Sequence, residues 1–239
     1  MIYYFSSPIP HVLACKVENV LMSFANDSKR IAEYAHLNVM IDSGAFTVWN
    51  SSKGEDHIDI DDYIKFLNTL PEKWVCINLD VIPTTGGGAA HIEECCHKSI
   101  ENYLYLKDRV KQQVLPVYHY GDPEVFLDKY LDHTDYIGIS PANDTHEKIK
   151  RAFLRDVYKR IGYKVKTHLL GYSSTTGLFL FPAYSFDSIS WKRIKVKDRG
   201  LWGSASKLHY FQRLKIYEFQ RLEKSLKEVW ERRGVRLWD

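Results

Sequence analysis

Short apolar runs alternate with helical segments along most of this chain, and that alternation constrains the fold more than any other feature. An apolar run closed by turn residues is typical of a strand that is buried on both faces. Strands that alternate with helices indicate βαβ units and a mostly parallel sheet. About eight such strands fit a compact (β/α)8 TIM barrel, of class α/β, better than an open doubly wound sheet. The expected strands are 2–5, 20–24, 39–42, 75–80, 114–119, 136–140, 165–170 and 185–190, and the expected helices are 28–35, 60–70, 89–110, 123–131 and 146–161.

A long basic helix is expected near the C-terminal end, over 206–233, where apolar residues such as Leu208, Phe211 and Leu222 follow helical spacing. Residues 192–239 hold fourteen Lys/Arg and six Asp/Glu, a balance of +8, so the rest of the chain carries −5 of the net charge of +3. A basic end on an acidic body indicates a surface for a polyanion, although a solvated basic helix face has the same composition. No repeat or linker interrupts the chain, and we expect one barrel domain over 1–239 with 192–239 packed on it.

Composition narrows the class of protein. Hydrophobic residues make up 45% and charged residues 26% of the chain, as in ordinary globular proteins. Neither a signal-peptide pattern nor a run long enough to cross a bilayer is present, so we expect no membrane partner. The cysteines Cys15, Cys76, Cys95 and Cys96 lack the spacing of a disulfide framework, which favours a cytoplasmic location.

Three of the apolar runs end in an aspartate: Asp42, Asp80 and Asp187. A carboxylate at the C-terminal end of a parallel barrel strand points into the mouth of the barrel, where barrel active sites lie. Two carboxylates that face one cavity can divide the work of glycosidic-bond chemistry, one as nucleophile and one as acid/base, and we expect this of Asp42 and Asp187. Taken alone, Asp42 is more typical of a turn in which the aspartate bonds its own downstream backbone.

Other polar and small residues follow the same strand ends and extend the candidate site. His119 is more often a positioning residue than a base, Trp191 is equally an ordinary core residue, and the glycines equally serve tight turns. The candidates for contact with a substrate are Ser43, Gly44, Phe46, Asp80, Tyr118, His119, Gly138, Ser140, His168, Gly171, Tyr172, Ser188 and Trp191.

Three further segments are interpreted structurally. His91 and Cys95 share a helix face, but no second ligand pair follows at matching spacing, so we expect buried thiols and no metal site. The glycines of 84–90 fit neither a phosphate-binding loop nor a dinucleotide fingerprint, and we interpret this segment as a lid or hinge. Asp122 and Pro123 predict the N-cap and the first residue of the helix that follows.

Taken in order, these segments resemble the tRNA-guanine transglycosylase (queuine/archaeosine) superfamily and are most similar to its compact phage-type members, which place 7-deazaguanines in DNA. The resemblance covers residues 17–191. Its most specific parts are Asp42-Ser-Gly-Ala-Phe46 and Phe186-Asp187-Ser188, supported by Asp80-Val-Ile-Pro83, His119-Tyr-Gly121 and Leu170-Gly171. It implies a barrel that exchanges guanine in a nucleic acid for a deazaguanine base such as preQ0 by double displacement, without a cofactor.

The resemblance also implies roles for individual residues. Asp187 would attack the ribose C1′ and expel guanine, and Asp42 would handle the ring proton of the base. Asp80 would grip the amide and amino edge of the base, with Gly171 beneath it and Phe46 as a stacking wall. At His119 the chain departs from the family, which commonly has glutamine nearby.

The chain also departs from the tRNA enzymes of this family. Ala45 replaces a glycine, Ser188 replaces a cysteine, and no Cys-rich zinc module follows Asp187. Because that module helps to hold tRNA, we expect DNA as the substrate. The alternatives are the same exchange on tRNA, a non-catalytic nucleic-acid-binding barrel and a sugar hydrolase. A homodimer, an accessory protein that opens the duplex and, for a phage-encoded protein, the host cytoplasm are compatible with this function. Phosphates would meet the basic residues Lys192, Arg193, Lys195, Lys197 and Arg199.

Overall fold

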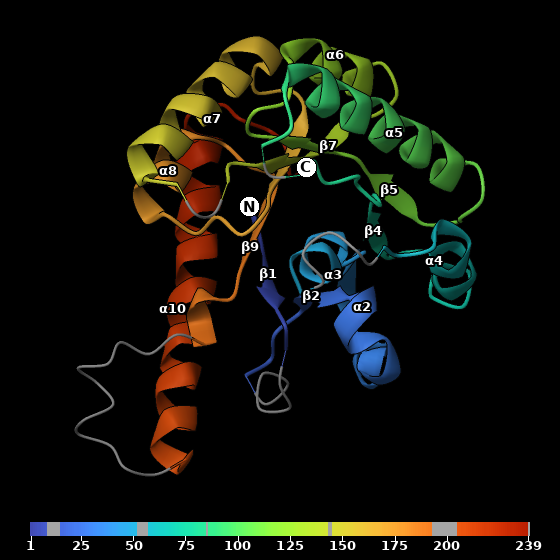
Figure 1. Ribbon diagram of the computed structural model, residues 1–239. Helices are drawn as coiled ribbons and strands as arrows, with labels where there is room; N and C mark the ends of the chain where they lie inside the picture. Colours follow the sequence, from blue (N-terminus) through green and yellow to red (C-terminus); the bar gives the residue numbers. More distant parts are fainter. Residues whose placement is uncertain (9–14, 52–56, 85, 143–144, 193–204, 239) are drawn as a thin grey trace. The chain divides into compact units, whose positions relative to one another are not determined.

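The computed structural model describes residues 1–8, 15–51, 57–84, 86–142, 145–192 and 205–238, and Figure 1 labels its helices and strands. The chain divides into two compact units. Unit 1 comprises Met1–Val20 and Pro141–Asp239, and unit 2 comprises Leu21–Ser140.

The fold class is α/β, and the predicted alternation of strands and helices is confirmed. Strands of the described residues are β1 (Ile2–Ser6), β2 (Asn19–Ser23), β3 (Asn38–Asp42), β4 (Val75–Ile77), β5 (Gln113–Leu115), β6 (Val117–His119), β7 (Tyr136–Ser140), β8 (Lys166–Leu169) and β9 (Ser185–Ser188). Their order in the sheet is β5-β4-β3-β2-β1-β9-β8-β7-β6, so that the first strand pairs with the last, as in a TIM-type barrel. The pairings β1–β9, β8–β9, β3–β4, β4–β5 and β6–β7 are all parallel.

The strand expected over 114–119 is interrupted in its middle. β5 pairs with β4, and β6 pairs with β7. Pro116 lies between β5 and β6 and has no N–H to donate to a ladder, while its carbonyl accepts a hydrogen bond from Gly138 N at 2.8 Å. The chain therefore changes its partner strand at Pro116, and the two ends of the strand order are consecutive in sequence.

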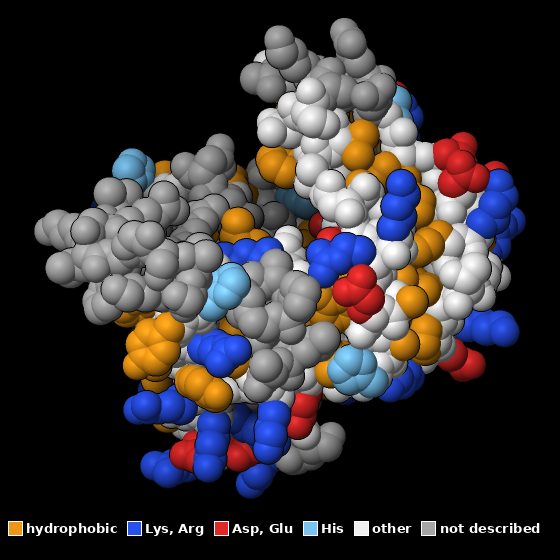
Figure 2. Space-filling model, turned by 90° about the horizontal axis from the view of Figure 1, so that it is seen from below, with side chains coloured by type: hydrophobic (Ala, Val, Ile, Leu, Met, Phe, Trp, Pro, Cys, Tyr) orange, Lys and Arg blue, Asp and Glu red, His pale blue; other side chains and the backbone are white. Residues whose placement is uncertain are grey.

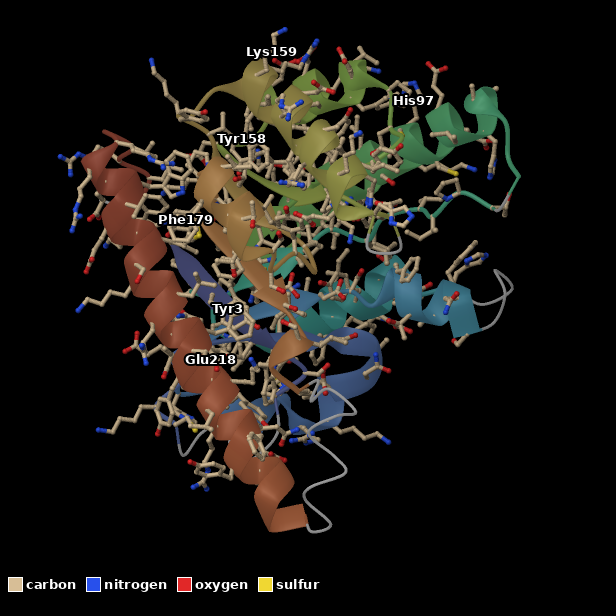
Figure 3. All side chains as sticks on the ribbon, turned by 90° about the vertical axis from the view of Figure 1, so that its left-hand side faces the viewer. Tyr3, His97, Tyr158, Lys159, Phe179 and Glu218 are labelled. Atoms are coloured by element: carbon tan, nitrogen blue, oxygen red, sulfur yellow. The ribbon has the colours of Figure 1, made fainter. Side chains whose placement is uncertain are left out.

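In unit 1 the helices are α7 (Glu147–Ile161), α8 (Thr175–Leu180), the 3-10 turn η2 (Ser190–Lys192) and α10 (Ala205–Arg232), which confirms the long basic helix. α10 contacts β1, where Tyr3 lies beside the helix (Figure 3). The rings of Tyr3 and Phe219 stack with centroids 4.5 Å apart. Trp230 of α10 donates from Nε1 to the carbonyl of Leu178 in α8 at 2.9 Å. These contacts fix α10 on unit 1.

In unit 2 the helices are α2 (Phe24–Asp27), the 3-10 helix η1 (Ser28–Tyr34), α3 (Ala45–Ser51), α4 (Ile60–Leu67), α5 (Ala89–Lys107) and α6 (Glu124–Leu131). Tyr63 of α4 is fully buried, and its hydroxyl donates to the carbonyls of Ile77 at 3.0 Å and Ile41 at 3.3 Å, close to the ends of β4 and β3. α5 contacts α6 through the edge-on rings of His97 and Phe126, whose centroids are 4.9 Å apart.

Several local predictions need correction. The helix expected over 28–35 is a 3-10 helix, and α3 and α8 were not expected. α8 contains two threonines and a glycine, residues of low helix propensity, and its start depends on the Ser174 hydroxyl, which accepts from Gly177 N at 3.4 Å. Asp122 does not cap α6, because Pro123 occupies the N-cap and the Asp122 carboxylate accepts from His119 N at 2.8 Å.

Candidate functional site

In unit 1, Asp187 lies near the C-terminal end of β9, on the face opposite the aromatic side chains that contact α10. Because side chains alternate along a strand, Ser185 and Asp187 share one face, and Phe186 lies on the other, with its ring 4.9 Å from that of Tyr3. The register places His168 of β8 opposite Ser185. Polar residues from neighbouring strands therefore gather around Asp187.

Two donors hold the carboxylate of Asp187, which is only 7% exposed. Gly171 N donates to Oδ1 at 2.7 Å, and the Ser6 hydroxyl donates to Oδ2 at 2.5 Å. Gly171 has a φ of 62°, in the left-handed region that glycine adopts without steric cost, so the turn after β8 can direct this N–H toward the carboxylate. The carboxylate is thus fixed in orientation at the end of its strand.

His168 lies beside the carboxylate and is fully buried. Its Nδ1 is 2.7 Å from the Ser185 hydroxyl oxygen, and its Nε2 is 3.3 Å from Asp187 Oδ1. The Nε2 contact lacks hydrogen-bond geometry, and Nε2 has no hydrogen-bond partner among the described residues. Ser185, His168 and Asp187 form a buried row in which an imidazole can hold or pass a proton beside a carboxylate. We call Ser6, His168, Gly171, Ser185 and Asp187 the Asp187 cluster.

Three predicted contact residues of unit 1 are packing residues instead. The indole of Trp191 is fully buried and donates from Nε1 to Ser6 O at 3.1 Å, so it supports the Asp187 cluster and has no exposed face for a base. Tyr172 is buried, and its hydroxyl donates to Glu147 Oε1 of α7 at 2.7 Å. Ser188 is buried on the other face of β9 from Asp187, and its hydroxyl donates to Ser190 Oγ at 2.8 Å.

In unit 2, Asp80 follows β4 and connects the end of that strand to the end of β6. Its Oδ2 lies 3.0 Å from His119 Nε2 at the end of β6, and its Oδ1 accepts from Asn78 Nδ2 at 2.9 Å. Asn78 is fully buried and also donates to the carbonyl of Ser99 in α5. We call Asn78, Asp80, His119 and Asp122 the Asp80 cluster.

The Asp80 cluster favours a positively charged His119. Burial acts against the imidazolium, but the hydrogen bond and charge of Asp80, with the charge of Asp122, outweigh it and raise the pKa of His119 above its usual value. Burial raises the pKa of Asp122, which His119 counteracts through its charge and its backbone N–H. The cluster can therefore present a carboxylate and an imidazolium side by side.

Of the remaining candidates of unit 2 near this cluster, Tyr118 and Gly138 are buried, and Ser140 lies at a strand end. Tyr118 is buried, and its hydroxyl donates to Asp122 O at 3.0 Å, so it stabilises the turn after β6. Gly138 is buried within β7, opposite Val117, and does not lie at a strand end. Ser140 ends β7 opposite His119 and accepts at its carbonyl from Tyr120 N. Ser140 and His119 are thus neighbours in the ladder.

Asp42 ends β3 in unit 2 and is half-buried, whereas Asp187 belongs to unit 1. Gly44 has a φ of 81°, and a Cβ there would lie 2.5 Å from the Ser23 hydroxyl oxygen, so this turn requires glycine. Ser43 is buried, and its hydroxyl accepts from Ala45 N at 3.4 Å. Phe46 is 64% exposed, with its ring available for stacking. Burial raises the pKa of Tyr63, and the negative charges of Asp42 and Asp80 both add to this shift.

Of the five basic residues that were expected to meet phosphates, the structure describes one. Lys192 is half-buried, with Nζ 5.3 Å from the centroid of the Trp191 ring. Arg193, Lys195, Lys197 and Arg199 lie outside the described residues. His91 Nε2 lies 3.8 Å from the Cys95 sulfur and accepts from Thr84 N at 3.2 Å. Over the described part of the chain, no three His, Cys, Asp or Glu side chains are grouped so that they could hold a metal ion.

Sequence reasoning missed four members of the two clusters. Ser6 and Ser185 belong to expected strands, and a polar residue at a strand end, or two residues from Asp187, was the signal that could have identified them. Asn78 carries the same signal two residues before Asp80. Asp122 was assigned to helix capping.

A scan against protein-family models found no match, and neither did a search of curated proteins. Among the helices that the structure describes, none is both long and apolar enough to cross a membrane.

Proposed function

We propose that this protein is a base-exchange transglycosylase that replaces guanine in DNA with a 7-deazaguanine base such as preQ0, through a covalent aspartyl–sugar intermediate. The observation that carries this proposal is the Asp187 cluster. It holds a buried carboxylate near the end of a parallel strand, oriented by Gly171 N and Ser6 and flanked by His168. An oriented carboxylate is the group that attacks a sugar C1′ in double-displacement chemistry.

The exchange proceeds in two balanced steps. First, an Asp187 oxygen bonds to C1′ while the C1′–N9 bond breaks, and guanine leaves with the electron pair as Asp42 supplies a proton. Second, the incoming base gives its N9 proton to Asp42, its N9 bonds to C1′, and the bond from C1′ to Asp187 breaks. The Asp187 carboxylate stabilises positive charge at C1′ in both transition states. A paired guanine has to be flipped out of the duplex to react.

The Asp80 cluster suits recognition of the base. A carboxylate can accept from both the ring N–H and the amino group of a guanine-like edge, which is the role we assign to Asp80. His119, charged beside Asp80, has a second ring N–H with which to donate to the carbonyl oxygen of the base. The exposed ring of Phe46, four residues after Asp42, suits stacking on the base.

The test is an exchange assay with DNA that carries labelled guanine, excess preQ0 and a parallel arm with labelled tRNA. We expect loss of label from DNA with incorporation of preQ0, no loss from tRNA, and no exchange by Asp187→Asn. Asp132→Asn, a matched change at an exposed aspartate after α6, is expected to retain full activity.

Each other outcome overturns a stated part of the proposal. Exchange by Asp187→Asn removes the nucleophile assignment, and loss of label from tRNA alone assigns the chemistry to tRNA. Release of guanine without incorporation identifies a hydrolase. Salt-sensitive binding without exchange, unchanged when Asp42, Asp80 and Asp187 are all replaced by asparagine, identifies a non-catalytic binding protein.

A further inference from the structure

The solvent-facing side of α10 carries exposed rings at helical spacing. Tyr210, Leu214 and Tyr217 are 60%, 39% and 49% exposed, and their spacing of four and three residues places them on one face of the helix. Large apolar side chains on a surface helix ordinarily turn toward the core. These three form an exposed apolar strip of the kind that is found at interaction sites.

Cations lie on the same face. Arg213, Arg221 and Lys224 are exposed, and at three, eleven and fourteen residues from Tyr210 they fall in line with the rings. Among the described residues, the ion pairs along α10 use Lys215, Lys227 and Arg232. In Figure 2 Lys and Arg side chains gather at the lower left around a few acidic ones, with hydrophobic side chains beside them. We call Tyr210, Arg213, Leu214, Tyr217, Arg221 and Lys224 the α10 stripe.

The stripe is separate from the packing face of α10. That face consists of Ile216, Leu226 and Trp230, which are buried, and of Phe219, whose ring stacks on that of Tyr3. Unit 1 therefore packs mainly on the other side of the helix. At one edge of the stripe Tyr217 hydrogen-bonds Cys15, and the stripe, roughly 21 Å long at 1.5 Å per residue, otherwise faces outward.

We infer that the α10 stripe binds a single-stranded segment of nucleic acid, an inference that rests on the proposed function for its biological context. Aromatic rings that alternate with cations suit single-stranded nucleic acid, because unpaired bases stack on aromatic side chains and phosphates bind Arg and Lys. A duplex offers no free base faces to Tyr210 and Tyr217. A second copy would set the same three cations against each other, and like charges at an interface are costly. A displaced strand is also what an enzyme that flips a guanine has to hold.

The experiment measures binding of the full chain to a fluorescein-labelled, guanine-free oligothymidylate by anisotropy at several salt concentrations, with a duplex arm and an oligouridylate arm. A guanine-free strand contains no base to exchange, so binding is read independently of the reaction. We expect Tyr210→Ser and Tyr217→Ser each to weaken strand binding about tenfold with an unchanged salt dependence. The triple variant Arg213→Gln/Arg221→Gln/Lys224→Gln is expected to reduce the slope of log K against log salt by about 2.

A charge-matched control is Lys65→Gln/Lys98→Gln/Lys215→Gln, which removes three lysines that are paired with Asp62, Glu94 and Glu218. Equal losses from both triple variants would mean general electrostatic attraction and would overturn the inference. Tyrosine variants that bind as tightly as the wild type would do the same, as would stripe variants that abolish self-association in sedimentation without affecting strand binding. If the stripe variants fail in one of these ways but the protein still exchanges bases, the inference is wrong and the proposed function stands. If the protein binds a strand through the stripe but exchanges no base, the proposed function is wrong and the inference stands.

Discussion

His168 is the residue on which we expect the reactivity of Asp187 to depend. It lies 3.3 Å from Oδ1 of the carboxylate and is tied to Ser185 on its other side. We expect His168→Leu to lower kcat of base exchange on the order of 10²-fold with little change in KM, because the carboxylate loses the polar ring beside Oδ1 and is then held by Gly171 N and Ser6 alone.

His168→Gln is the matched variant, since its amide keeps a polar group beside Asp187, and it is expected to recover most of the lost kcat. Steady-state kinetics with circular dichroism as a check on folding would measure both. Equal losses in the two variants, or a loss confined to KM, would show that His168 does not position Asp187.

His119 gives a prediction of stability against pH, because the hydrogen bond and charge of Asp80 raise the pKa of His119 against the effect of burial. A histidine with a raised pKa takes up its proton more readily in the folded state. Its stabilisation is therefore fully present below the unfolded value of about 6.5 and is lost as the pH rises through the folded value.

We expect His119→Gln to lower the free energy of unfolding more at about pH 5.5 than at about pH 9. Urea unfolding at both pH values measures the difference. A loss that is equal at both, or larger at alkaline pH, contradicts the ionic role of the Asp80–His119 pair.

Among the elements, α8 depends on a glycine. A Cβ at Gly177 would overlap the hydroxyl oxygen of Tyr172, which is buried and hydrogen-bonded to Glu147. We expect Gly177→Ala to destabilise the protein by about 1–3 kcal/mol, although alanine raises helix propensity, because the ring of Tyr172 has to move.

Gly88→Ala at the N-cap of α5 is the control, because nothing lies within 4 Å of a Cβ there. We expect this change to alter stability by about 0.5 kcal/mol or less. Urea unfolding measures both variants, and a neutral Gly177→Ala would mean that Tyr172 and α8 are loosely packed.

The elements also show where sequence patterns suffice. The strands that carry Asp42 and Asp187 were predicted because apolar runs closed by turn residues are local signals. The split of 114–119 at Pro116 was not predicted. It follows from the change of partner strand at Pro116, and the partners of a strand are known only from the folded sheet. α8 was missed because its start depends on one serine and its packing on Tyr172.

For the molecule as a whole, the sequence by itself determined the α/β class, the mostly parallel sheet and the position of an aspartate near the ends of three strands. Hydrophobic periodicity and turn chemistry act over a few residues, so they can be read along the chain. The tertiary structure alone decided which side chains surround each aspartate. Ser6 hydrogen-bonds Asp187 although the two are 181 residues apart in the sequence, and Trp191 is a buried core residue. Such contacts depend on strand register, in which a shift of one residue turns every side chain to the opposite face.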